Sequence, residues 1–344
     1  MLCLDLSLHQ IVTFTVQAGA ETMSFEIKQK TAEHRLIEAI KGWAGDHYIG
    51  DDCAILPHQQ LLTSDTLVEG THFVTPLISW LDLGWKTLAV NLSDIAAMAG
   101  RPRFALISLT LPAHVEHRQL REFYAGLIDC AGAYRTEVVG GDLTRGALMV
   151  VTATVLGEAH ANGCLRRSGA NPGDVVAVSG DFGASAAGLW ALQSGAGGYQ
   201  LVKQRHCRPL PLLTESWGLI EKTGGGGALM DASDGLADAL VQIAAASAVG
   251  MEIDVAAVPV VEETRQAAAA AGVDSLEWAL YGGEDYALVA CIPPAAWQTM
   301  IESGDPFTAI GVVNQSGTIT LNNSGGLGPE IDLGRSFQHW ENVL

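Results

Sequence analysis

Acidic residues stand at the ends of several apolar segments of this sequence. In LMDASDGLADAL, Asp231 and Asp234 close a hydrophobic run just before a helical pattern begins. An Asp or Ser there is often only a helix N-cap, because its side-chain oxygen accepts the unpaired N–H groups of the first turn. For Asp234 alone, and equally for Asp94, capping is the simpler interpretation.

The same pattern recurs along the chain, which changes that interpretation. The acidic and hydroxyl residues that stand at or near the ends of apolar segments are Asp51, Asp52, Thr63, Ser64, Asp65, Asp94, Asp142, Asp231, Ser233, Asp234, Glu284 and Asp285. Carboxylates gathered from several strand ends would repel one another unless cations compensated them. Mg²⁺ supplies that compensation, because it binds hard oxygen ligands together with phosphates and water. The set therefore predicts a metal–phosphate site.

The composition limits what such a site binds. The 344 residues carry a net charge of −19, which argues against nucleic acid and anionic membrane surfaces as partners. Bound divalent cations would still let so acidic a chain hold a polyphosphate. The six cysteines lie far apart without C-x-x-C spacing, so we expect reduced thiols in a cytoplasmic protein.

The elements that must position these residues alternate between strand and helix patterns. A turn-rich stretch near residue 165 separates two such series. This order predicts an α/β (α+β) fold of two domains with a boundary near residue 160. The segment 81–100 is expected to be a helix that runs up to the start of a second helix.

The first 22 residues resemble a signal peptide in part. They are apolar and end in small residues, as a signal peptide does, but their start carries Asp5 and no Lys or Arg. Met23 follows, and AEHRLIEAIKGW then predicts an amphipathic helix. We therefore expect residues 1–22 to lie outside the fold, with an N-terminal domain over 23–160 and a C-terminal domain over 161–344.

The order of the motifs resembles that of a known family. GDDCAIL, TSDTLVEGTHF, NLSDIAAMAG, GGDLTRG, RSGANPGD, DASDGL and GGEDY follow one another as they do in the thiamine-monophosphate kinases of the aminoimidazole-ribotide synthetase-like ATP-binding superfamily. The resemblance covers about Glu33 to the C-terminus. It implies a two-domain fold, with an N-terminal mixed sheet with helices and a C-terminal α/β domain, and a homodimer formed through the N-terminal domain.

The resemblance also implies residue roles, with ATP held between the domains by several Mg²⁺ ions. By motif match the metal ligands would be Asp52, Thr63 or Ser64, Asp65, Asp94, Asp142, Asp231 and Asp234. ATP would contact Tyr124, Gly141, Asp142, Arg167 and Ser233, and thiamine monophosphate would contact His72, Glu284, Phe337 and Trp340. The C-terminal RSFQHWENVL departs from the family's aromatic-rich ending, which leaves open the ring that stacks on the substrate.

Two of these roles have a physical basis of their own. The guanidinium of Arg167 offers planar paired donors to phosphate oxygens, although a solvated loop arginine is the alternative. Glu284 could offset the thiazolium charge or pair with the aminopyrimidine, whereas His72 rests on the motif alone.

The implied reaction is phosphoryl transfer from ATP to thiamine monophosphate, giving thiamine diphosphate. A phosphate monoester has a second pKa of about 6, so the acceptor is mostly a dianion at neutral pH and needs no strong base. We therefore expect no catalytic nucleophile or base, and direct in-line transfer supported by metals and positioning.

Other functions remain as alternatives, and protein-kinase chemistry is not among them. The DFG at Asp181–Gly183 lacks the H-R-D and V-A-I-K partners of a protein kinase and instead predicts a strand-to-helix turn. The alternatives are another ATP-dependent enzyme of the same superfamily and a non-catalytic nucleotide- or metal-binding protein.

Overall fold

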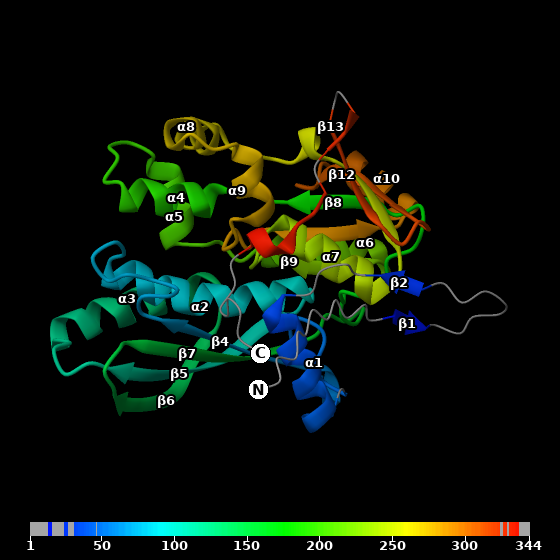
Figure 1. Cartoon of the computed structure of the whole chain (residues 1–344). Helices are drawn as coiled ribbons and strands as arrows, with labels where there is room; N and C mark the ends of the chain where they lie inside the picture. The colour runs from blue at the N-terminus through cyan, green and yellow to red at the C-terminus, as the bar shows by residue number, and fades with distance from the viewer. Residues whose placement is uncertain are drawn as a thin grey trace, which may run out of the picture.

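The computed structural model describes residues 31–45, 47–323, 326–328 and 330–336, together with 13–15 and 24–26 (Figure 1). Its elements form two sheets, each accompanied by helices. In Figure 1 the five-stranded sheet lies in the lower part of the molecule and the seven-stranded sheet in the upper part. The fold class expected from the sequence is confirmed.

The first sheet is mixed and contains the strands of the N-terminal half. Its strands are β3 (Ala54–Leu56), β4 (Gln60–Val68), β5 (Arg101–Leu111), β6 (Glu137–Arg145) and β7 (Val150–Glu158). They lie in the order β3-β4-β7-β5-β6, with β5 and β6 parallel and the other neighbours antiparallel. The edge strand β6 is therefore separated from β4 by two strands.

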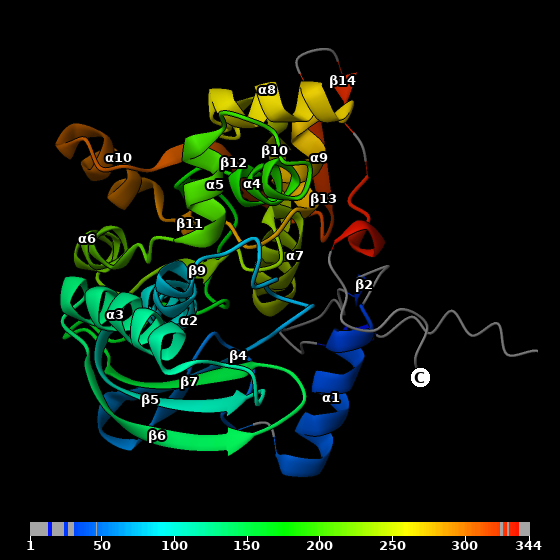
Figure 2. The same cartoon turned by 90° about the vertical axis from the view of Figure 1, so that its left-hand side faces the viewer.

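Side chains alternate between the two faces of this sheet. On β5, Ala105 and Ile107 are buried beneath helices, whereas Phe104 and Leu106 are exposed on the opposite face. The buried face is covered by α2 (Trp80–Ala97) and α3 (His117–Ala133), as Figure 2 shows. Because the period of a strand is two, the exposed residues form an apolar outer face.

Helix α2 lies between the two sheets and is continuous from Trp80 to Ala97. The expected second helix start inside this segment is therefore wrong, and so is the interpretation of Asp94 as an N-cap. Ser93 and Asp94 are tolerated within the helix because their side chains bond elsewhere. Ser93 donates to Asp231, and Asp94 accepts from Thr63.

The second sheet is built from the C-terminal half. Its strands are β8 (Val175–Ser179), β9 (Ala228–Asp231), β10 (Gly250–Asp254), β11 (Leu288–Ile292), β12 (Thr308–Asn314), β13 (Ile319–Asn323) and β14 (Gly326–Leu327). Their order is β14-β13-β10-β12-β8-β11-β9, and only β10 and β13 among these described strands pair in parallel.

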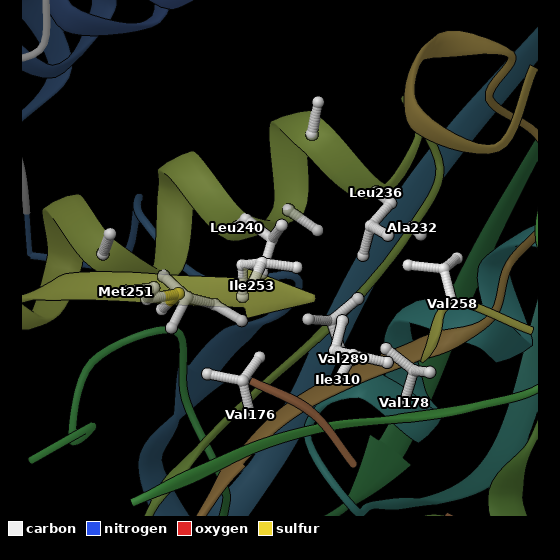
Figure 3. Close-up of a cluster of buried hydrophobic side chains, with 14 of the residues drawn as sticks. Val176, Val178, Ala232, Leu236, Leu240, Met251, Ile253, Val258, Val289 and Ile310 are labelled. Carbon is white, nitrogen blue, oxygen red and sulfur yellow. The ribbon is translucent and has the colours of Figure 1, made fainter. Parts of the chain in front are cut away.

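The remaining helices surround these sheets. They are α1 (Ala32–Ala44), α4 (Ala184–Gln193), α5 (Gln200–Cys207), α6 (Leu213–Thr223), α7 (Leu236–Ser247), α8 (Glu262–Ala271), α9 (Ser275–Tyr281) and α10 (Pro294–Ser303). As Figure 3 shows, Leu236 and Leu240 of α7 pack on Ile253 of β10 and Val289 of β11. This packing fixes the turn between β9 and α7, which carries Asp234.

Other expectations are tested in part. Most of residues 1–22 lie outside the described residues, although Thr13–Thr15 (β1) pairs antiparallel with Ser24–Glu26 (β2). We retain the division at residue 160 as a proposal, which the separation of the two sheets supports. Within the described residues no helix has the length and apolar character to cross a membrane.

Candidate active site

The acidic residues predicted from the sequence meet in one cavity of about 380 Å³. It lies where β4, α2, the β9–α7 turn and the loop before β3 come together. Its lining includes nine of the predicted residues: Asp52, Thr63, Ser64, Asp65, Asp94, Arg167, Asp231, Ser233 and Asp234. Elements from both halves of the chain therefore contribute to it.

Three carboxylates form the centre of the cavity. One oxygen from each of Asp52, Asp94 and Asp231 lies within 4.8 Å of the other two. Asp65 lies on β4 beside them, and its N–H donates to the side chain of Asn91 (2.9 Å). Because β4 alternates, Thr63 faces α2 like Asp65, whereas the hydroxyl of Ser64 donates to the carbonyl of Ala153 (3.1 Å).

The electrostatics of this centre favour a bound cation. Burial, followed by the charge of Asp52, raises the pKa of Asp231 to about 8. Burial also raises the pKa of Asp94, with Asp65 as the next cause. Burial is also the main cause that raises the pKa of Asp65 to about 6 and the pKa of Asp234 to about 7. Buried like charges and oxygen ligands fit Mg²⁺ well.

The turn between β9 and α7 shows that Asp234 is not a cap. Helix α7 begins at Leu236, its N-cap residue is Gly235, and among the described residues the helix has no side-chain cap hydrogen bond. Gly235 has φ 103°, and a Cβ atom there would lie 2.6 Å from the carbonyl oxygen of Leu280. The capping interpretation is therefore wrong for Asp234 as well, and its carboxylate faces the cavity.

Arg167 is the cation nearest to these carboxylates among the residues that line the cavity. Its Nη2 and Nε donate to the two oxygens of Asp52 at 2.9 and 3.4 Å, and Nη1 donates to Gln242. Its side chain is 21% exposed, so the alternative of a solvated loop arginine is wrong. One guanidinium does not balance the several carboxylates around it.

Three predicted residues lie away from this cavity in the same chain. Tyr124 lies on α3, and Gly141 and Asp142 are exposed on the edge strand β6. Strands lie about 4.8 Å apart, so β6 is about 14 Å from β4 across β7 and β5. Asp142 accepts a hydrogen bond from Thr144 (3.1 Å). One chain therefore does not bring these residues to the carboxylate centre.

Glu284 lies beside the cavity, in the loop that precedes β11. Its N–H donates to the carbonyl of Ser233 (2.6 Å), and the N–H of Tyr286 donates to Ala232 (3.2 Å). The GGEDY loop is thus bonded directly to the DASDG turn. The Glu284 side chain lines a second cavity of about 270 Å³. Phe337 and Trp340 lie outside the described residues.

Two groups of residues in this region were not predicted from the sequence. Thr31, Glu33 and His34 of the α1 segment line the carboxylate cavity, and α1 stands beside β4 in Figure 2. Lys86 lies on α2 with its Nζ 2.9 Å from Glu284 Oε1. A lysine inside the apolar run LDLGWKTLAV was the available signal for Lys86, whereas nothing in the spacing of Glu33 marked it.

The fold and this cavity define the class of the protein, that of the AIR synthase related proteins. The family model of their N-terminal domain matches residues 50–159, and that of their C-terminal domain matches residues 171–322. Within this class, the chain belongs to the thiamine-monophosphate kinase family.

Its relatives cover most of its length. Thiamine-monophosphate kinase of Salmonella typhimurium is 41% identical over 280 residues, covering 76% of this chain and 82% of the relative. The enzyme of Synechococcus elongatus is 33% identical over 336 residues, covering 92% of this chain and 99% of the relative. A solved structure described as "AaThiL complexed with AMPPCP and TMP" has a TM-score of 0.78 and 33% identity, covering 85% of this chain and 93% of its own.

Proposed function

We propose that this protein transfers the γ-phosphate of ATP to thiamine monophosphate, giving ADP and thiamine diphosphate. The observation that carries the proposal is the centre formed by Asp52, Asp94 and Asp231, in a chain of the thiamine-monophosphate kinase family. Support comes from the similar structure described with AMPPCP, an analogue of ATP, and TMP. Transfer is direct and in line.

We propose that the carboxylates of the cavity hold Mg²⁺ and, through it, the triphosphate. Asp52, Asp94 and Asp231 would share the central ion, with Asp65 and Asp234 beside them. When bound, Mg²⁺ offsets the charge of the phosphates and of the transition state. The chain's own contribution is position, because α2, β4 and β9 hold the ligands on rigid elements.

Arg167 and Ser233 are assigned to the nucleotide. Arg167 is held by Asp52 and Gln242 at the wall of the cavity, so little side-chain entropy is lost when it meets a phosphate oxygen. Ser233 lines the cavity between Asp231 and Asp234. Both side chains would therefore orient the phosphates relative to the carboxylate centre.

The acceptor is assigned to the region of Glu284 and His72. A carboxylate there offsets the positive thiazolium ring, while the acceptor phosphate points towards the Asp231 centre. Because that phosphate is mostly a dianion at neutral pH, none of these residues needs to remove a proton. Alignment of the two phosphates is the main requirement.

We further propose that Tyr124, Gly141 and Asp142 act in a homodimer, each serving the site of the partner subunit. The outer face of the first sheet supports this arrangement, because Phe104, Leu106, Val139 and Leu143 are 41–65% exposed there. A second copy on this face would bury the apolar side chains and bring its β6 edge towards the opposite β4.

A mixing experiment tests this arrangement. Asp142→Asn and Asp231→Asn variants should each turn over poorly alone. A mixed dimer has one site with Asp231 and the partner's Asp142 both intact, so an equal mixture should recover about a quarter of wild-type turnover. No recovery after subunit exchange would contradict the shared site.

The reaction itself is tested by coupled measurement of ADP formation. ADP formation should depend on thiamine monophosphate, and thiamine diphosphate should appear in the same amount as ADP. Unphosphorylated thiamine is the matched control. ADP formation that ignores thiamine monophosphate would favour another enzyme of the superfamily, and nucleotide binding without ADP formation would favour a non-catalytic binding protein.

We also infer a cytoplasmic location. The five described cysteines, Cys53, Cys130, Cys164, Cys207 and Cys291, are free thiols. Reduced thiols are typical of the cytoplasm, where ATP is also available. Fractionation of the cells with an antibody to the protein would test the inference.

A further inference from the structure

Glu284 is held by basic side chains that the reaction scheme above does not use. Lys86 of α2 is completely buried, and its Nζ lies 2.9 Å from Glu284 Oε1. The other oxygen, Oε2, lies 3.5 Å from Nδ1 of His206 on α5. His206 in turn contacts the hydroxyl of Ser185 on α4 (2.9 Å). Side chains of α2 and α5 therefore hold this carboxylate, and α4 holds His206.

We propose that Lys86 is a positioning residue for the acceptor: it acts through Glu284, whose orientation and negative charge it fixes. The inference rests on the proposed role of Glu284 at thiamine monophosphate. Lys86 itself does not reach the substrate, because its side chain is completely buried whereas that of Glu284 is 27% exposed. The exposed part of the carboxylate is left to meet a cation.

A buried lysine is unfavourable for stability unless something compensates it. Burying an ammonium group costs several kcal/mol in general, and an apolar side chain of similar size is often more stable than a buried ion pair. Within the described residues, Nζ of Lys86 has no hydrogen bond of good geometry, and its compensation is the ion pair with Glu284. An arrangement that is poor for stability indicates a functional reason.

The backbone around Glu284 supports the same conclusion. Glu284 and Tyr286 have φ of 56° and 52°, in the left-handed region that non-glycine residues rarely adopt. Between them, Asp285 accepts hydrogen bonds from the N–H groups of Gly183 (2.6 Å) and Ser185 (3.0 Å) at the start of α4. Such backbone conformations persist where the surrounding contacts fix them, and they cluster at functional sites.

The charges that face Glu284 decide its ionisation. They come from Lys86 on α2, His206 on α5, His72 after β4 and Asp285 in its own loop. Burial would raise the pKa of Glu284, but Lys86, followed by the imidazoles, holds this pKa below its usual value. His206 has its pKa lowered to about 4 by burial and by Lys86, so it is neutral near pH 7. Lys86 is therefore the main cation.

The test is steady-state kinetics of Lys86→Met across about pH 5.5 to 9. Without the lysine, burial dominates and the pKa of Glu284 rises, so the carboxylate is protonated at the acid end. The KM for thiamine monophosphate should rise about tenfold or more near pH 6 and recover as the pH increases, with the KM for ATP nearly unchanged. Lys222→Met, which removes a lysine of α6 that pairs with Asp305, is the matched control and should keep wild-type kinetics.

A double variant keeps the test valid if Lys86→Met folds poorly. Lys86→Met combined with Glu284→Gln leaves no lone buried charge. If Lys86 acts through Glu284, adding Lys86→Met to Glu284→Gln should leave the KM for thiamine monophosphate and its pH dependence as they are in Glu284→Gln. A further rise in KM in the double variant would overturn the inference.

The outcomes separate this inference from the function on which it rests. If Glu284→Gln raises the KM for thiamine monophosphate but Lys86→Met leaves the pH profile unchanged, the inference alone is wrong. A uniform loss of turnover at every pH in Lys86→Met would have the same meaning. If Glu284→Gln leaves this KM unchanged, or the wild type forms no ADP with thiamine monophosphate, the role of Glu284 or the function fails first and the inference fails with it.

Discussion

Helix α2 meets two clusters of charge, and the same burial has opposite results in them. In its last turn Asp94 meets Asp52 and Asp231, and the pKa values of Asp94 and Asp231 are raised. Two turns earlier Lys86 meets Glu284, whose pKa is lowered. The difference is the cation that the chain itself supplies. Beside Glu284 the chain supplies a cation, so this carboxylate is ionised before any ligand binds. Around Asp94 and Asp231 the chain supplies too little positive charge, so these carboxylates depend on cations from solution.

Neutralising one carboxylate of the uncompensated cluster should have the largest effect. Asp231→Asn and Asp234→Asn each keep a side-chain oxygen but lose a charge that would hold Mg²⁺, so turnover should fall by roughly a hundredfold or more. The melting temperature without ligand should stay equal or rise slightly, because a repelling charge has been removed. Turnover and thermal unfolding are the two measurements.

Asp305→Asn is the matched control for these variants. Asp305 pairs with Lys222 at 2.6 Å, away from the cavity. Its loss should lower stability slightly and leave turnover intact, which is the reverse pattern. If the Asp234→Asn protein melts several degrees lower but turns over normally, Asp234 has a structural role and does not hold the metal.

Removing the metal should weaken nucleotide binding strongly. With excess chelator the triphosphate meets buried carboxylates without compensation, so its affinity should fall by at least about tenfold. Calorimetric titration of ATP with and without Mg²⁺ measures this. Equally tight binding in both conditions would mean that the cluster is not a metal–phosphate site.

Asp285 is an intermediate case, because N–H groups donate to it but no described cation forms an ion pair with it. Burial raises its pKa to about 7, although the N–H groups of Ser185 and Gly183 lower it in part. Because this folded-state pKa exceeds the ordinary 3.8, its contribution to stability is complete below about pH 4 and is lost as the pH rises through about 7.

Asp285→Asn should remove this pH dependence. The variant loses one of two good acceptors and should be less stable at acid pH. Between about pH 5 and 8, however, its free energy of unfolding should fall by about 3 kcal/mol less than that of the wild type. Urea unfolding at both pH values measures the difference, and parallel curves for the two proteins would show that Asp285 does not titrate in this range.

Deleting residues 1–22 should have the smallest effect. The charged residues of the two clusters on α2 lie between residues 52 and 284, so the deletion removes none of them. Turnover and melting temperature should stay nearly unchanged. A large loss in either would mean that the extension packs on the fold.

The sequence predicted what depends on local pattern. The alternating strand and helix patterns predicted the fold class, and the apolar run ending at Asp231, followed by a helical pattern, predicted the strand, turn and helix of β9 and α7. The gathering of Asp52, Asp94 and Asp231 followed from their residue types and motif order.

What depends on distant partners could not be predicted. Ser93-Asp94 looked like a helix start because its bonds to Thr63 and Asp231 are tertiary. The pairing of Lys86 with Glu284 joins positions far apart in the chain. The distance of Asp142 from the cavity depends on strand order, which no local pattern specifies.

The continuity of α2 has a further consequence for substrate choice. Lys86 and Asp94 lie on one unbroken helix, eight residues or about 12 Å apart along its axis. Because most residues of α2 are buried, the helix holds a fixed spacing between Lys86, which contacts Glu284, and the carboxylate centre at Asp94. If Glu284 and this centre hold the two ends of the acceptor, as proposed above, an acceptor of the right charge but the wrong length would place its phosphate out of line. The helix would then select substrates by size as well as by chemistry.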